Sequence, residues 1–384
     1  MSLDGDWQVS YGDLATTVIG DITEIYVRIG RVNVTDQWSV SEARIVVWYP
    51  DPAAASYLHA NLSIGERIII DGPVDPSTSL RYRKWTGICK DIRYLYGMPY
   101  DSGTTYGVGD YLIIEAEGRL AEWNRTLTDG YTVTSTNAKD AIEEVATEFD
   151  LPVLVSSQVS RVPINPTTIV GDVGTWLQNV AVTGQLRLLD GSADGVDVYL
   201  TDPVQYGDKI FSDTTNDSTH VLYDDLEFDS LSDNYYTDVT VSSDGIGSAT
   251  SSLGGFTKKR YLEIDTLAAT VAQCQDLADY IRQALDSATL APSTISCKSN
   301  GQATFEAGYN VFTGPTPFAS QVRFGVDIDF RGMDKSGVIE GGEITLRPDG
   351  YRVTWNLSGA GYYSALVLNS STNGLLNVNT LGLY

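Results

Sequence analysis

The sequence predicts a mainly β protein with an α+β insert, built from two β-barrel-like domains and a small α/β domain. Two patterns predict the strands. Apolar and polar residues alternate with a period of two along many segments, as in strands that bury one face. Asp-Gly and Asn-Gly pairs, which accept positive φ and close tight turns, lie between these segments. A third pattern, apolar residues at helical spacing, is confined to a few segments and predicts the helices.

The strand pattern is clearest near the end of the chain. In 322–331 five apolar residues alternate with Arg, Gly and Asp, and in 351–357 Tyr, Val, Trp and Leu alternate with polar residues. The same pattern predicts further half-buried strands at 24–34, 43–49, 111–117 and 196–201. Because turns between antiparallel strands favour glycine, the 36 Gly residues agree with this prediction.

Two amphipathic stretches predict helices that pack on a sheet. The first runs from an N-cap at Thr136 to Phe149, with acidic residues near its positive end. The longer one covers 266–285, where either Asp265 or Thr266 is expected to cap the start. Both have an apolar stripe of ordinary width, which indicates packing against a sheet and not a cofactor site.

A third, shorter helix is expected to hold Trp176 and to end at Gly184. The acidic loop 190–195 after it resembles the start of an EF-hand calcium loop. Thr201 stands where that loop needs an acidic ligand, and a strand follows in place of a helix. We therefore interpret 186–200 as a hairpin of two short strands.

Changes in composition near residues 118 and 205 divide the chain into four predicted parts. They are a first β-barrel-like domain at 1–118, a small α/β domain at 119–205, a second β-barrel-like domain with the long helix at 206–355, and a C-terminal tail at 356–384. No internal repeat is visible, although the first and third parts share a barrel-like strand pattern.

The residues that usually carry catalysis are scarce or badly placed. The two histidines, His59 and His220, lie in no catalytic or zinc-binding motif. Asp327 and Asp329 share one strand face and could serve a glycosidase, but 50 acidic residues make such pairs frequent, so a solvated face is preferred. The other acidic pairs are Glu115/Glu117, Glu143/Glu144 and Asp224/Asp225. We predict no catalytic residue, no metal ligand, no cofactor and no enzymatic activity.

The cysteines and the chain start bear on the compartment. Cys89, Cys274 and Cys297 are widely spaced and form no zinc motif, so we interpret them as buried thiols of a protein made in a reducing cytosol. The acidic N-terminus is not a secretory signal. No run approaches the roughly 18 apolar residues of a spanning helix, so no integral membrane segment is expected.

The net charge of −25 excludes several classes of partner. A surface with this charge repels nucleic acid and anionic lipid, so no sequence-specific binding to nucleic acid is expected. The only basic triplet, 258–260, is expected to cap a strand or to pair with acids. A hydrophobic content of 42% is enough for buried cores and excludes a disordered chain.

The order of several weak motifs is more informative than any one of them. In chain order these are Trp85–Ile92 (WTGICKDI), Leu112–Trp123, Trp176–Ala181, the hairpin at 186–201, Tyr223–Phe228, Asn234–Val241, Arg260–Leu267, Gly342–Leu357 and Tyr363–Tyr384. This series resembles the tail hub proteins of long-tailed bacteriophages, also called baseplate hub or tail-tip proteins. It is most similar to the minor tail proteins of actinobacterial phages, and the resemblance covers about residues 18 to 384.

The resemblance implies a structural virion protein at the phage tail tip, made in the host cytoplasm. It implies a homotrimer whose barrel domains form a pseudo-sixfold ring, which joins the sixfold tail tube to the tip and surrounds the DNA exit channel. The implied partners are a distal tail or tail-tube protein above, the C-terminus of the tape-measure protein in the lumen, and tail-tip or receptor-binding proteins below. At this place the protein would take part in host attachment and genome ejection. The family has no active site, and its domains can interleave along the chain.

Two other interpretations stay open from the sequence. The chain could be a β-rich carbohydrate-binding or glycan-hydrolysing protein of the tail, or the hub of a contractile injection machine. If a ring of this chain encloses the path of DNA, acidic walls would keep phosphates from sticking to it.

Overall fold

The computed structural model describes most of the 384 residues. The described ranges are 7–12, 16–17, 21–32, 36–49, 62–75, 77–101, 106–192, 195–200, 205–214, 220–229, 236–254, 259–286, 291–298, 317–331 and 333–359.

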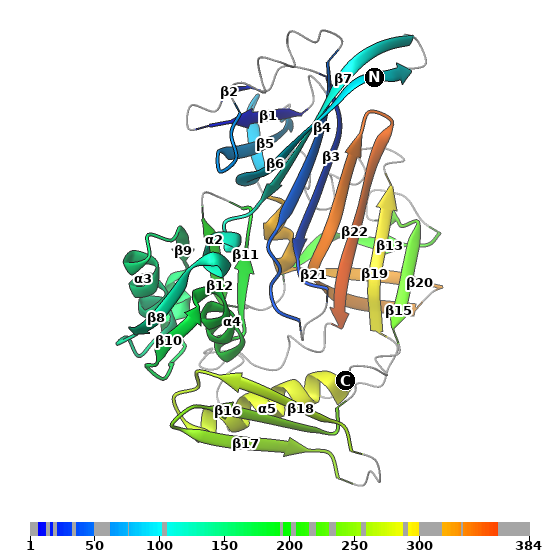
Figure 1. Ribbon diagram of the computed structural model, residues 1–384. Helices are drawn as coiled ribbons and strands as arrows, with labels where there is room; N and C mark the ends of the chain where they lie inside the picture. The colour runs from blue at the N-terminus through cyan, green and yellow to red at the C-terminus, as the bar shows by residue number, and fades with distance from the viewer. Residues whose placement is uncertain are drawn as a thin grey trace.

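One branched, 14-stranded sheet dominates the described part and confirms the predicted mainly β fold (Figure 1). Its N-terminal strands are β1 (Gln8–Tyr11), β2 (Thr16–Thr17), β3 (Asp21–Gly30), β4 (Glu42–Tyr49), β5 (Arg67–Val74), β6 (Arg81–Asp101) and β7 (Tyr106–Glu117). Its C-terminal strands are β13 (Gln205–Ser212), β14 (His220–Leu222), β15 (Asp225–Asp229), β19 (Ala291–Lys298), β20 (Phe324–Phe330), β21 (Met333–Arg347) and β22 (Gly350–Gly359).

The C-terminal strands close into a barrel. Neighbouring strands pair in the order β13, β20, β21, β22, β19 and β15. β14 directly precedes β15 in the chain and pairs with β13. β14 and β15 together therefore act as one bent strand, which links β13 to β19 and closes the ring. Side chains that alternate along these strands fill the interior, among them Phe211, Ile295, Val326 and Trp355, each at most 1% exposed.

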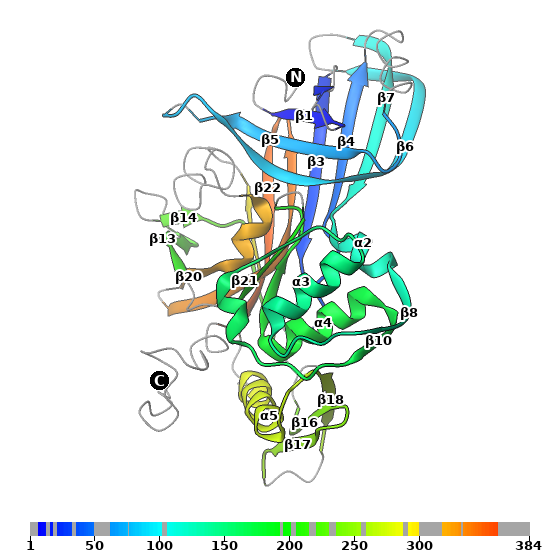
Figure 2. The same ribbon diagram turned by 90° about the vertical axis from the view of Figure 1, so that its left-hand side faces the viewer.

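The N-terminal strands form a curled sheet, in the order β3, β4, β7, β6, β5 and β1. β6 pairs with β5 up to Ile88 and with β7 from Ile88 onward, and Figure 2 shows its first half crossing over β3 and β4. Gly87 lies at this change of partner. A Cβ there would lie 2.2 Å from the carbonyl oxygen of Glu117 and 2.3 Å from the ring of Trp85, so only glycine fits.

The strand β21 belongs to both sheets. β22 occupies one edge of β21 from Gly337 to Arg347. The other edge pairs first with β20, over residues 333–338, and then with β3, over residues 341–346. A register irregularity between Ile339 and Gly341 marks the change of partner. The first and last strand groups of the chain are therefore parts of one hydrogen-bonded sheet.

A compact α/β insert follows β7 and lies on one flank of the sheet (Figure 2). Its elements are α2 (Leu120–Arg125), β8 (Leu127–Thr132), α3 (Ala138–Glu148), β9 (Val153–Val155), the 3₁₀ helix η1 (Ser157–Arg161), β10 (Thr168–Asp172), α4 (Val173–Gly184), β11 (Leu186–Leu189) and β12 (Val196–Leu200). The predicted short helix and the hairpin of β11 and β12 are confirmed. The predicted N-cap Thr136 is wrong, because Asn137 accepts the hydrogen bond from the Asp140 amide and α3 begins one residue later.

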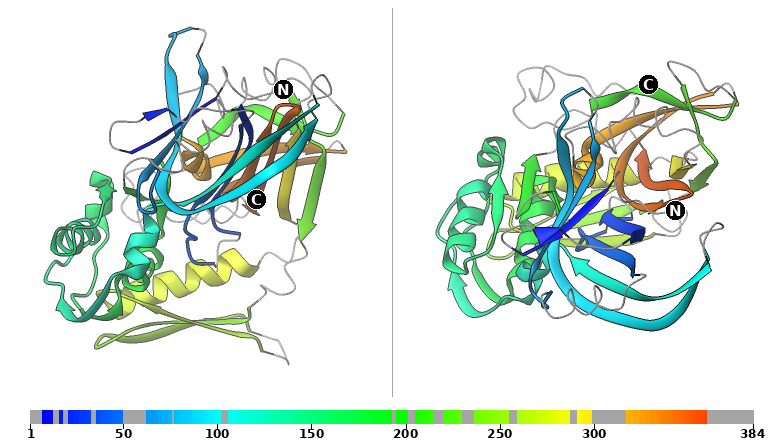
Figure 3. Two further views of the ribbon diagram at one scale, coloured as in Figure 1. Left: turned by 45° about the horizontal axis from the view of Figure 1, so that its top comes forward. Right: turned by 90° about the horizontal axis from the view of Figure 1, so that it is seen from above.

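A second small α/β unit covers residues 236–286. It contains β16 (Asp238–Ser243), β17 (Gly247–Ser252), β18 (Tyr261–Thr266) and α5 (Val271–Asp286), with α5 along one face of the sheet (Figure 3). Its buried core of Val239, Val241, Ala268, Cys274, Leu277 and Ala278 is separate from the main core. The long predicted helix thus packs on this sheet and not on the barrel.

The start of that helix differs from the prediction. Asp265 and Thr266 cannot cap it, because they are the last residues of β18 and pair with β16. Thr270 caps it instead: its hydroxyl oxygen accepts a hydrogen bond of 3.1 Å from the Gln273 amide. Strand pairing of 265–266 with β16 therefore sets where α5 begins, and the helical spacing of the apolar residues does not show it.

The separate core of the 236–286 unit leads to a test of local stability. We expect Leu277→Ala to destabilise this unit by about 2–5 kcal/mol, because Leu277 is fully packed in a small core. Hydrogen exchange of the Val239 and Val241 amides should accelerate, while amides of the barrel strands keep their rates. Val271→Ala is the matched control, since Val271 is 45% exposed. Equal acceleration in the barrel would contradict an independent core.

Candidate functional site: the buried junction of the sheets and the insert

The residues considered for catalysis do not form a cleft site in the described part. His59 lies outside the described residues, and His220 is half-buried at the start of β14. Asp327 and Asp329 lie half-buried on one face of β20. Within the described ranges no three His, Cys, Asp or Glu residues form a group that could hold a metal ion. The absence of a catalytic site stays a prediction.

Several of the paired acids are engaged by basic side chains or by backbone amides. Glu117 contacts Arg125 and Glu115 contacts Arg93. The carboxylate of Glu144 accepts hydrogen bonds from the backbone amides of Thr134 and Ser135. In the basic triplet, Lys259 lies 3.3 Å from a carboxylate oxygen of Asp238, as expected, while Lys258 is outside the described residues. The contacts give these acids structural partners.

All three cysteines are free and buried, as predicted. Burial raises the pKa of the Cys89 thiol to about 11 and also raises those of Cys274 and Cys297. At neutral pH the three thiols are therefore protonated and act as small apolar side chains.

Asp190 fastens the insert to the N-terminal sheet. Its carboxylate accepts a 2.7 Å hydrogen bond from the backbone amide of Ser41, just before β4, and a 3.0 Å bond from that of Leu120, at the start of α2. A Cβ on Gly118 would lie 2.1 Å from this carboxylate, so the chain can pass here only as glycine. Burial raises the pKa of Asp190 to about 6, against the opposing effect of the donated hydrogen bonds. The residue that resembled a calcium ligand thus holds backbone amides.

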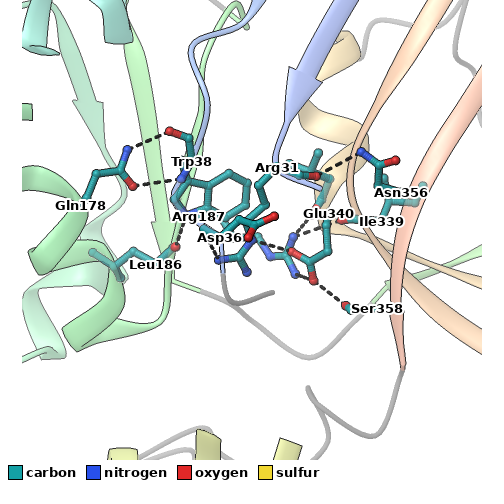
Figure 4. A network of polar contacts seen from close by, with 11 residues as sticks. Arg31, Asp36, Trp38, Gln178, Leu186, Arg187, Ile339, Glu340, Asn356 and Ser358 are labelled. Carbon is teal, nitrogen blue, oxygen red and sulfur yellow. Dashed lines mark hydrogen bonds and ion pairs between the residues drawn. The ribbon is translucent and has the colours of Figure 1, made fainter. Parts of the chain in front are cut away.

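Glu340 lies at the point where β21 changes partner and is fully buried (Figure 4). Arg31, just after β3, donates from Nε to its carboxylate at 2.9 Å, and the Ser358 hydroxyl donates to it at 2.5 Å. Arg187, from β11 of the insert, lies 3.7 Å from the same carboxylate and donates to the carbonyl oxygen of Ile339 at 3.2 Å. One carboxylate therefore joins three segments that are far apart in sequence.

Trp38 extends this junction into the insert (Figure 4). The Gln178 side chain of α4 accepts from the Trp38 amide at 3.0 Å and donates to its carbonyl oxygen at 2.9 Å. The indole N–H donates to the carbonyl oxygen of Leu186 at 3.2 Å. The guanidinium of Arg31 lies 4.4 Å from the centre of the indole ring, a cation–π distance. We call Arg31, Trp38, Gln178, Arg187 and Glu340 the junction cluster.

The junction cluster holds parts of the chain together and lacks a nucleophile with a neighbouring base. No sequence motif or periodic pattern marks any of its members as functional. Glu340 stands before Gly341-Gly342, a small signal of a bulge, but nothing in the sequence relates it to Arg31 or Arg187.

Comparison with known proteins gives a fold-level result. No protein-family model and no curated sequence matches the chain. The crystal structure of the 43 kDa tail protein of prophage MuSo2 from Shewanella oneidensis is similar, with a TM-score of 0.61 and 11% identity over 94% of this chain and 98% of that one. The tail protein from Neisseria meningitidis MC58 gives a TM-score of 0.61 and 14% identity, over 93% and 98%.

The chain therefore has the fold of these tail proteins, and the resemblance predicted from the sequence is confirmed at the level of the fold. Both matches span nearly the whole of each chain, so the barrel, the curled sheet and the two small α/β units are compared together. Among the helices of the described part, none is both long and apolar enough to cross a bilayer.

Neutralising Glu340 should weaken the junction strongly. Glu340→Gln leaves Arg187, which is 3% exposed, without its negative partner, and breaking a buried pair in this way costs about 3–5 kcal/mol. Chemical denaturation should show a loss of this size in the free energy of unfolding. The control is Glu42→Gln, in an exposed pair with Arg28, where we expect a loss below about 1 kcal/mol. Similar losses in the two variants would refute the role of the junction.

The raised pKa of Asp190 leads to a pH dependence of defined sign. The folded-state pKa of about 6 lies above the ordinary 3.8, so the folded state binds this proton more tightly. The resulting stabilisation is complete below pH 3.8 and is lost as the pH rises through about 6. Relative to Asp190→Asn, the wild type should lose up to about 3 kcal/mol of unfolding free energy over this range. Denaturation of both proteins at several pH values tests this, and a constant difference would contradict it.

Proposed function

We propose that this chain is a structural virion protein that forms a trimeric hub at the distal end of a phage tail. In this role it joins the sixfold tail tube to the tail tip and surrounds the DNA exit channel. The observation that carries the proposal is the likeness to two tail proteins over more than nine-tenths of the chain. Since the identity is 11% and 14%, that likeness concerns the fold, and the function is our inference from it.

The four predicted parts of the chain are the domains of the proposed hub. We keep the four parts 1–118, 119–205, 206–355 and 356–384. The shared strand β21 favours the version in which the first and third parts interleave, because β3 and β20 pair along the same strand. Two barrel-like sheets side by side in one subunit are what a pseudo-sixfold ring of three subunits requires.

A non-enzymatic role agrees with the arrangement of charged residues in the described part. The buried carboxylates of Glu340 and Asp190 join distant segments, and the three thiols are protonated. We propose that the partners are tail proteins: a distal tail or tail-tube protein, the C-terminus of the tape-measure protein, and tail-tip or receptor-binding proteins. The net charge of −25 would keep the phosphates of passing DNA from binding to the wall of the ring.

The assembly is tested by measuring mass and position. Purified chain alone should give by light scattering a particle of three times 41.7 kDa. With a tail-tube partner, the mass should rise by that of the bound partner copies. An electron-microscopy map of virions should place three copies at the tail end. A stable monomer that clears polysaccharide would instead support the glycan-binding or glycan-hydrolysing alternative, and a basic wall around the channel would refute the electrostatic part.

A further inference from the structure

The small sheet of the 236–286 unit has an open edge at β17. The strand order is β17, β16, β18, so β17 pairs with β16 on one side only. The amide of Leu253 donates to the carbonyl oxygen of Thr237 in front of β16. Because backbone groups alternate in direction along a strand, the N–H and C=O groups of Ser251 and Ala249 also point toward β16. Those of Ser248, Thr250 and Ser252 point outward, and these three residues are exposed. No described residue pairs with that edge.

This edge lacks the features by which proteins usually protect open strands. β17 reads Gly-Ser-Ala-Thr-Ser-Ser and has no charge and no proline. Its register with β16 runs without a bulge from Gly247 to Ser252. The opposite edge, β18, exposes Glu263 and Asp265. An uncharged, regular edge of this kind is a template for a further strand.

The segment 360–384 has the sequence of such a strand. In a chain of net charge −25 it contains no Asp, Glu, Lys or Arg. Its two runs 362–368 and 375–383 are rich in Leu, Val and Tyr, and Asn373-Gly374 stands between them as in a hairpin. Leu376 and Val378 alternate with Asn377 and Asn379 in the second run. Uncharged runs rich in Leu, Val and Tyr associate readily with other strands when they are exposed.

The described chain ends at the end of the barrel that carries the 236–286 unit. β22 ends at Gly359, and it pairs antiparallel with β19, with Thr294 opposite Asn356. The start of β19 and the end of β22 therefore lie at the same end of the barrel. β19 begins at Ala291, five residues after α5 ends at Asp286, so this is the end that carries the 236–286 unit. Figure 1 shows β22 directed toward that unit.

We propose that a strand from segment 360–384 of the same chain adds to the outer edge of β17 and extends the sheet to four strands. The absence of charge on both partners avoids the repulsion that like charges would cause in so acidic a protein. The added strand would tie the end of the barrel to the 236–286 unit, which in the described part docks on the insert through few polar contacts, such as Asn165 to Asp244.

Hydrogen exchange on the full chain tests the pairing. We expect slow exchange at the amides of Ser248, Thr250 and Ser252 and in one run of 360–384. Deleting 360–384 should accelerate the three β17 amides about tenfold or more. Thr250→Pro removes an outward N–H, keeps the backbone bonds to β16 and loses the hydroxyl contact with Thr240. It should accelerate exchange in 360–384.

The control is Glu263→Pro on the opposite edge of the same sheet. The backbone carbonyl oxygen of Arg260 accepts a hydrogen bond from the Asp238 amide, so the backbone groups of Arg260 and Leu262 point toward β16. The N–H of Glu263, one residue further on, therefore points away from β16. This variant should leave exchange in 360–384 unchanged, and the amides of Val239 and Val241 report that each variant is folded. Fast exchange at β17 in the full chain, or slow exchange that survives the deletion, would overturn the proposal. Protection that grows with protein concentration would also overturn it, because the strand would then come from a second copy.

Discussion

The architecture depends on the change of partner along one edge of β21. One edge of β21 pairs with β22. The other edge pairs with β20 along its first half and with β3 along its second half. Close backbone packing makes this possible: Gly30 has φ +72°, and a Cβ there would lie 2.3 Å from the carbonyl oxygen of Glu340. Two sheets from opposite ends of the chain thereby share one hydrogen-bond ladder, and neither can shift without the other.

The polar groups at this point need partners because water does not reach them. Glu340 is fully buried, and its carboxylate is offset by Arg31 and Arg187 and by a hydroxyl donor. Such an arrangement adds little net stability over an apolar one, but any other register of β21 would leave a charge unpaired. We infer that the junction cluster selects the register and the docking of the insert. The chain has only 25 basic residues against 50 acidic ones, and two of its arginines lie beside this one carboxylate.

Local patterns predicted local structure well. The helix ending at Gly184 and the hairpin after it follow from spacing and turn residues within the range 173–200. The predictions that were wrong are at element ends, at Thr136 and at Asp265 and Thr266, where a side-chain cap competes with pairing to a distant strand. Asp190 shows the same limit: its acidic loop was read correctly as a turn, but its buried contact with Ser41 crosses 149 positions.

The sequence by itself determined the strand and helix content, the buried thiols, the net negative charge and the resemblance to tail proteins. These are properties of residue type and short-range order, which a periodic pattern records directly. Only the tertiary structure decided that β21 serves two sheets, that the long helix has its own sheet, and that Glu340, Arg31 and Arg187 meet. Hydrogen bonds between strands join any two segments with compatible edges, so the pattern that makes a strand does not specify its partner.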